Sequence, residues 1–125
     1  MKPPPPGPPD VDEFRELVDQ WSTFTADLVK QGYNFDIDNW LNDVDVRQLI
    51  EEARAMFSRE EMGDHALKLD AADKGFIEAT KDFKRCVWSS RTAKQEKWTV
   101  TRNWWYFRTP RRSNGQLEDE LATVR

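Results

Sequence analysis

The sequence has few of the side chains on which enzymes most often rely. Among its 125 residues there is one histidine, His65, and one cysteine, Cys86. A single cysteine forms no internal disulfide. With one histidine and one cysteine, the chain gives little support to a Ser/His/Asp or a Cys/His catalytic arrangement. We therefore expect a protein without enzymatic activity, cofactor or metal site.

Long apolar runs are also missing. No stretch of about 18 apolar residues occurs, so we expect no membrane span. The first residues lack the apolar core of an export signal and the Arg/Ser-rich pattern of a transit peptide, which predicts an intracellular protein in an undefined compartment. Apolar residues make up only 38% of the chain and charged residues 34%. We expect a modest core in which large aromatic side chains compensate for the small apolar fraction.

Phosphate-binding and calcium-binding patterns are absent as well. The chain has neither a P-loop nor a dinucleotide fingerprint. Several aspartates lie between residues 36 and 45, but counting from Asp36 places Leu41 where a calcium loop needs glycine and Arg47 where it needs glutamate. We interpret these aspartates as helix caps. Glu61, Asp64 and His65 are interpreted as helix-surface ion-pair partners rather than metal ligands.

What the sequence does contain is charge sorted along its length. Residues 1–70 carry a net charge of −9, and residues 71–125 carry +5. Between Lys81 and Arg112, ten Lys or Arg stand against two acidic residues, and the same segment holds four tryptophans, Tyr106 and Phe107. We call residues 81–112 the basic aromatic block. A basic surface interleaved with rings is typical of a site for an anionic or flat partner.

Helical periodicity covers most of the chain before this block. Asp10 and Glu13 form a capping pair that begins a helix, and Gly32 is placed to end it. Apolar residues recur at helical spacing from Ile37 to Val44, and a second register runs from Val46 to Phe57. Ser58 with Glu61 is a capping box that opens a weak segment. A further helix is expected from Asp70 or Asp73, and its predicted inner face holds Phe76, Ile77, Thr80, Phe83 and Val87.

The period changes from 3.6 to 2 after Arg91. Residues 97–109 are rich in β-branched and aromatic side chains, which predicts either one long strand or a hairpin turning at Arg102 and Asn103. Adjacent strand residues point to opposite faces, so we expect one of Trp104 and Trp105 to be buried and the other to be available to a partner. Ser113, Asn114 and Gly115 form a turn signal before a short terminal helix.

These patterns predict an α+β fold that is predominantly α, with three to four helices and a C-terminal aromatic-rich β-hairpin or long strand. Residues 1–9 are expected to be a proline-rich extended tail. Residues 10–112 are expected to form one helical domain with the β element. Residues 113–125 are expected to be a C-terminal tail or short helix.

Segregated charge and surplus aromatic surface favour a non-enzymatic protein-protein interaction protein, such as a small accessory subunit of a larger complex. The alternative is a nucleic-acid-binding module that uses the same block to neutralise phosphates and stack bases. A third interpretation is that the block packs on the acidic helices of its own chain or of a second copy. The predicted partner-binding residues are Trp88, Arg91, Lys97, Trp98, Arg102, Trp104, Trp105, Tyr106, Arg108, Arg111 and Arg112.

Overall fold

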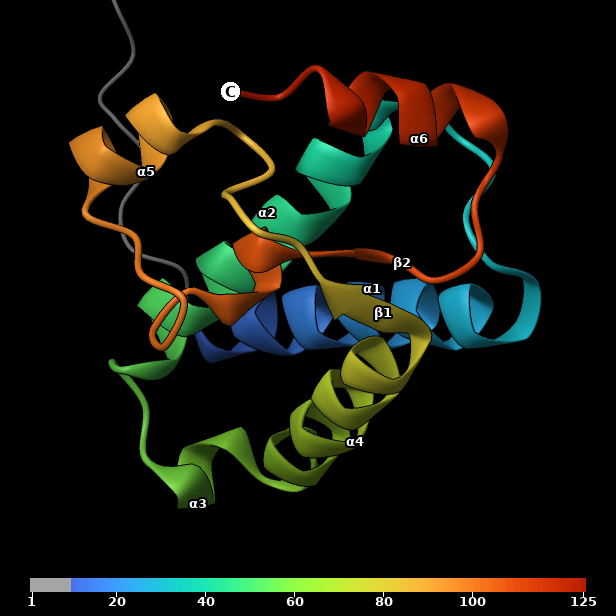
Figure 1. The fold of residues 1–125 in the computed structure, drawn as a ribbon. Coiled ribbons are helices and arrows are strands. Elements are labelled where there is room, and N and C mark those ends of the chain that lie inside the picture. Colours follow the sequence, from blue (N-terminus) through green and yellow to red (C-terminus); the bar gives the residue numbers. More distant parts are fainter. Residues whose placement is uncertain (1–9) are drawn as a thin grey trace, which may run out of the picture.

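A computed structural model describes residues 10–125, and Figure 1 shows their fold. In this part of the chain six α-helices and one two-stranded antiparallel sheet are present, which confirms a predominantly helical α+β class but exceeds the expected helix count. The predicted proline-rich tail lies outside the described residues. The elements are α1 (Val11–Gln31), α2 (Ile37–Arg54), α3 (Arg59–Met62), α4 (Asp64–Ala79), β1 (Thr80–Asp82), α5 (Ser90–Glu96), the 3₁₀ helix η1 (Trp104–Phe107), β2 (Arg108–Pro110) and α6 (Gly115–Ala122).

Helix α1 begins and ends where its local signals predict. The Asp10 carboxylate accepts a hydrogen bond from the Glu13 amide at 2.8 Å. Gly32 follows the last turn with φ of 73°. A Cβ at Gly32 would lie 2.8 Å from the carbonyl oxygen of Arg112, so a larger residue is excluded by both backbone strain and close approach.

The two apolar registers between residues 37 and 57 belong largely to one continuous helix, α2. Trp40 and Val44 are buried from the first register, and Val46 and Ile50 are buried from the second. The buried face of α2 shifts along its length because α1 covers part of the helix while η1 and α6 contact other parts. The second register predicts that Leu49 and Met56 are buried with Val46 and Ile50, and this is wrong because both are exposed.

Helix α4 begins earlier and ends sooner than the sequence pattern indicates. Its first residue is Asp64, and Thr80 ends it with extended backbone. Phe76 is buried as expected, whereas Ile77 is exposed. Beyond Ala79 the chain forms β1 and then an irregular segment, so the predicted helical face does not continue to Val87. The Ser58/Glu61 capping box is confirmed at the start of α3.

The predicted strand or hairpin over residues 97–109 is wrong. The Asn103 side-chain oxygen accepts a hydrogen bond from the Thr99 backbone N–H at 3.1 Å. The Asn103 backbone N–H donates to the Thr99 carbonyl at 2.8 Å, and the two bonds close a local turn. Residues 104–107 then form η1, in which successive side chains diverge around the helix instead of alternating. Only Arg108–Pro110 is extended, and it pairs with distant β1 in the register Lys81 to Thr109.

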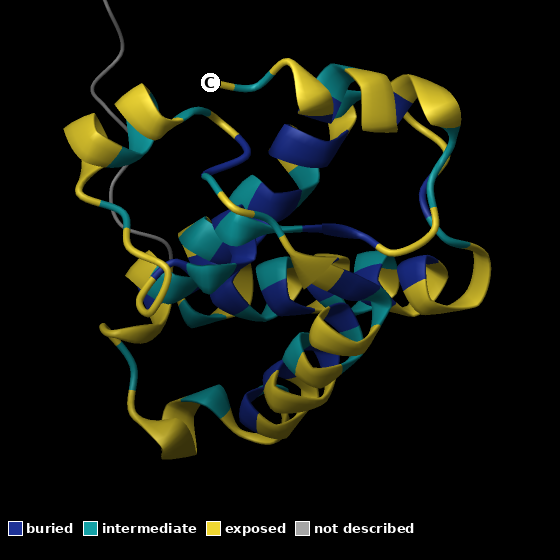
Figure 2. Ribbon diagram, viewed as in Figure 1, coloured by how far each residue is buried: buried dark blue, intermediate teal, exposed yellow. Residues whose placement is uncertain are grey.

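The core is an aromatic cluster between α1, α2, α4 and η1. Trp40 and Phe76 stack with ring centroids 5.9 Å apart and an interplanar angle of 19°. Trp21 lies 4.9 Å from Phe76, measured between centroids. Figure 2 shows the buried segments converging where these helices cross, while α3 and the outer faces of α5 and α6 are mostly exposed. Leu117 and Leu121 join α6 to this core.

Candidate functional site

The Arg108 guanidinium contacts other groups of the same protein chain. Its Nη2 donates to the carbonyls of Ile77 and Thr80 at 3.1 and 3.0 Å, and its Nε donates to the Thr80 hydroxyl at 2.7 Å. Its Nη1 pairs with Asp82 at 2.8 Å. The last carbonyls of a helix are unpaired and carry the negative end of the helix dipole, so a guanidinium here stabilises the end of α4.

Three further arginines of the block also contact backbone carbonyls near the ends of helices. Arg111 donates to the Glu78 carbonyl in the last turn of α4, and Arg112 donates to the Val29 carbonyl in the last turn of α1. Arg85 donates to the Val124 carbonyl just after α6. These contacts fix the three guanidinium groups at different places on the fold, and each keeps its positive charge; Arg111 and Arg112 remain exposed, while Arg85 also lines a groove beside β1.

The remaining predicted cations do not converge with these arginines. Arg91 and Lys97 belong to α5 and its C-cap, whereas Arg111 and Arg112 follow β2 (Figure 1). Arg102 donates to the Lys97 carbonyl at 3.1 Å and borders a groove that also contains acidic residues. In the described part of the chain, no ion pair joins a cation of the block to a carboxylate of residues 10–70.

The rings of the block divide between core and surface. Trp105 and Tyr106 are 0% and 1% exposed, so the prediction that they contact a partner does not fit this structure. Their burial follows from the inward packing of η1. Trp104 is half-buried against the core, and Trp98 stacks on Tyr106 with centroids 4.0 Å apart. Trp88 is 37% exposed and donates its indole N–H to Asp45 at 3.0 Å.

Arg47 is a buried cation whose structural role the sequence analysis missed. Its side chain is 3% exposed, forms a two-bond contact with Asp73 at 2.9 and 3.0 Å, and pairs with Glu51 at 3.0 Å. Its guanidinium carbon also lies 4.7 Å from the centroid of the Trp105 ring. Position 47 lies between the buried residues Val46 and Ile50, but sequence alone does not identify which distant carboxylate balances the charge.

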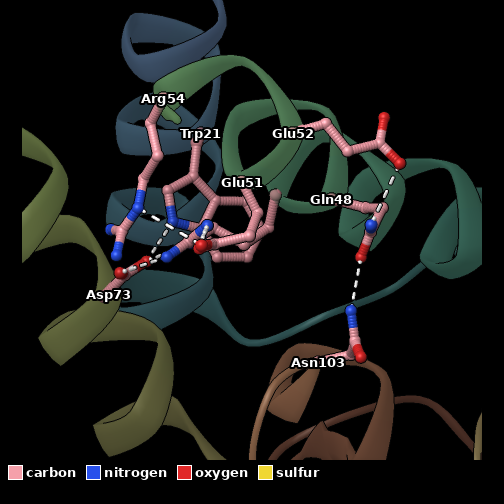
Figure 3. A network of polar contacts seen from close by, with 8 residues as sticks. Trp21, Gln48, Glu51, Glu52, Arg54, Asp73 and Asn103 are labelled. Atoms are coloured by element: carbon pink, nitrogen blue, oxygen red, sulfur yellow. Dashed lines mark hydrogen bonds and ion pairs between the residues drawn. The ribbon is translucent and has the colours of Figure 1, made fainter. Parts of the chain in front are cut away.

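Figure 3 shows the surrounding polar network. Asp73 on α4 accepts the indole N–H of Trp21 on α1 at 2.9 Å, so this carboxylate connects helices that are distant in sequence. Arg54 pairs with Glu51 at 3.2 Å near the surface. Farther along α2, Gln48 accepts from the Asn103 amide at 2.9 Å, which anchors the turn before η1. The contacts of Gln48 with Asn103 and of Arg47 with Trp105 thus hold part of the block against α2.

Two buried phenols donate to aspartates. Tyr106 donates to Asp45 at 2.7 Å and Tyr33 donates to Asp43 at 2.5 Å. Burial, reinforced by these hydrogen bonds and the nearby negative charges, raises the pKa of both phenols well above their ordinary value. Burial also raises the pKa of the Cys86 thiol, which disfavours the reactive thiolate.

A groove of about 480 Å³ opens between the two-stranded sheet and α6. Its apolar lining includes Phe83, Pro110 and Leu121. Lys81 and Lys84 also line it, and neither ammonium group has a carboxylate partner among residues 10–125. We call this site the β1–α6 groove. Both lysines belong to the basic aromatic block but were not among the predicted partner-binding residues.

Other features of the described chain limit the candidate chemistry. Residues 10–125 contain no group of three His, Cys, Asp or Glu side chains placed to hold a metal ion. His65 contacts Asp19 at 3.0 Å, while Lys68 contacts the same carboxylate at 2.5 Å. Among these residues, no helix has the length and apolar character needed to cross a membrane. Comparisons with protein-family models, curated proteins and solved structures find no match to this chain.

Proposed function

We propose that this protein is a non-enzymatic protein-protein interaction protein, acting as a small accessory or structural subunit of a larger complex. The surface part of the basic aromatic block holds the partner. The observation that carries this proposal is the β1–α6 groove, where Lys81 and Lys84 share the lining with Phe83, Pro110 and Leu121. A mixture of apolar and charged groups is typical of a protein-binding site, in which buried apolar contacts supply affinity and surrounding charges supply specificity.

The distribution of cations gives less support to nucleic-acid binding. A nonspecific nucleic-acid groove follows the phosphate backbone with several cations and presents rings for stacking. Here Arg108 is largely enclosed and paired with Asp82, Trp105 is buried, and the exposed Arg111 and Arg112 are each held on a backbone carbonyl of a different helix. This arrangement favours a protein partner over an extended polyanion.

Capture from a native lysate, with and without nuclease, tests this proposal. We would compare the wild-type chain with two charge-reversed pairs, Lys81→Glu with Lys84→Glu and Arg91→Glu with Lys94→Glu. The matched control is Lys30→Glu with Lys74→Glu, which makes the same charge change at exposed positions outside the block. Thermal melting would establish that every variant folds.

The expected result is protein capture that resists nuclease, persists in the control and is reduced at least about tenfold by one block variant. Capture abolished by nuclease would favour the nucleic-acid-binding alternative. Equal capture by the control and both block variants would show that the binding surface lies elsewhere.

A further inference from the structure

In the β1–α6 groove the cations come from one side of the lining. Lys81 stands directly opposite Thr109 in the sheet register, and both residues line the groove. Lys84 adds a second unpaired cation on the same side of the site. Leu121 and Ala122 of α6 contribute apolar surface across from the sheet. An occupant therefore meets cations from the β1 side and apolar side chains from both sides.

The two carboxylates in the lining do not cancel the positive charge of the groove. Asp82 is paired with Arg108 at 2.8 Å, so its charge is already balanced. Glu118, in the first turn of α6, accepts a hydrogen bond from the neutral Ser113 hydroxyl at 3.4 Å and keeps its charge, so it offsets one of the three cations. Lys81, Lys84 and Arg85 thus leave a local cationic excess beside Phe83.

We propose that the β1–α6 groove binds a short acidic segment of a partner protein that carries an apolar side chain among its carboxylates. This inference rests on the proposed function and assigns it to one part of the block. The carboxylates contact Lys81 and Lys84, while the apolar side chain packs on Phe83, Pro110 and Leu121. The groove volume of about 480 Å³ is in the usual range for a site that accepts a few side chains.

A protein segment fits these features better than a nucleic acid does. Phosphate recognition gains from a row of cations, whereas this groove offers Lys81, Lys84 and Arg85 around an opening that also retains Glu118. The apolar side chains in its lining give little to a phosphate or sugar but favour an aliphatic or aromatic side chain. The charge and shape together select an acidic, amphipathic peptide.

Fluorescence anisotropy on the full chain tests this inference with synthetic peptides. The principal probe is a short labelled peptide in which glutamates flank a leucine and a phenylalanine. One control peptide has glutamines in place of the glutamates, and another has serines in place of the two apolar residues. A labelled single-stranded oligonucleotide supplies the nucleic-acid comparison.

We expect the principal peptide to bind at about 50 mM salt and to bind several-fold more weakly at about 500 mM, where ionic screening is stronger. Each control peptide should bind at least about tenfold more weakly. Lys81→Glu with Lys84→Glu should produce a similar loss, and Lys81→Gln with Lys84→Gln a smaller one. Lys30→Glu with Lys74→Glu should leave binding unchanged.

Several results would overturn the assignment. These are no binding of the principal peptide, equal binding of the glutamine peptide, or unchanged binding by folded Lys81/Lys84 variants. Tighter binding of the oligonucleotide, lost in the same variants, would identify a nucleic-acid site instead. If lysate capture depends on Arg91 and Lys94 while the peptides do not bind, the proposed interaction function remains and the assignment to this groove fails.

Discussion

At the scale of single residues, the adjacent Trp104 and Trp105 differ in burial. Trp105 is fully buried and contacts the Arg47 guanidinium, whereas Trp104 is half-buried. One ring of the pair is buried, as expected, but Trp104 also packs partly against the core, and the geometry of η1 rather than strand alternation sets the difference between them. The two indoles therefore contribute unequally to folding. That Trp104 contacts a partner stays a prediction.

Trp105→Ala should lower the free energy of unfolding by roughly 3–5 kcal/mol, because it removes a large buried ring and leaves a cavity. Trp104→Ala should cost less, since its ring is less buried. Trp88→Ala is the matched surface control and should cost about 1 kcal/mol through loss of its hydrogen bond to Asp45. Urea denaturation measures all three values, and equal losses for Trp104 and Trp105 would contradict this description.

The only two tyrosines also give a residue-scale signature in alkaline solution. Tyr33 and Tyr106 retain their protons more strongly in the folded protein than in the unfolded chain, where a phenol titrates near pH 10. Their stabilising contribution should be complete below about pH 10 and decline as the pH rises above it. Absorbance at the tyrosinate band should show delayed ionisation in folded protein and ordinary ionisation in denaturant. Ordinary titration of both phenols without unfolding would contradict their burial.

At the scale of elements, Arg47 and Asp73 hold α2 to α4, while the Trp21 indole connects the same carboxylate to α1. A buried ion pair is expensive to desolvate, and removing one partner leaves the other charge uncompensated. The network therefore constrains how these three helices pack against η1.

Arg47→Met should lower the free energy of unfolding by roughly 3–5 kcal/mol. Asp73→Asn should also destabilise, and the double variant should cost less than the sum of the two single changes because the interaction is already lost. Arg54→Met is a suitable control, since Arg54 pairs with the same Glu51 at the surface, and should cost no more than about 1 kcal/mol. Additive effects in urea denaturation would contradict direct coupling between Arg47 and Asp73.

At the scale of the whole molecule, no ion pair within residues 10–125 joins a cation of the basic aromatic block to a carboxylate of the acidic first part of the chain. Arg85, Arg108, Arg111 and Arg112 instead contact backbone carbonyls from several elements. Hydrogen bonds at helix ends depend on short-range geometry, whereas attraction between exposed charges is screened by salt. The cations that are concentrated in one part of the sequence therefore contact backbone groups in several different elements of the fold.

Raising sodium chloride from about 20 to 500 mM should lower the melting temperature by no more than about 4 °C, because exposed ion pairs contribute little individually. Differential scanning calorimetry measures this shift, and sedimentation at both salt concentrations provides the mass control. A much larger fall, or a dimer that dissociates in high salt, would instead support electrostatic docking of the block on acidic helices of its own chain or of a second copy.

Local patterns predicted much of the first half of the fold but little of the second. The Asp10 cap, Gly32 and the Ser58/Glu61 capping box depend on neighbouring residues, and the structure confirms each of them. Residues 97–109 have the composition of a strand, yet the turn at Asn103 and the burial of Trp105 favour η1. Here tertiary packing outweighs local strand preference.

The sequence by itself determined the helical class, the main N-terminal helix boundaries and the concentration of cations and rings in the block. Tertiary structure decided that β1 pairs with β2, that Arg47 is buried and that Arg108, Arg111 and Arg112 cap distant helices. It also decided that Lys81 and Lys84 line a groove with α6. The physical reason is range: capping and periodicity involve residues a few positions apart, whereas burial and charge pairing depend on segments brought together only by folding.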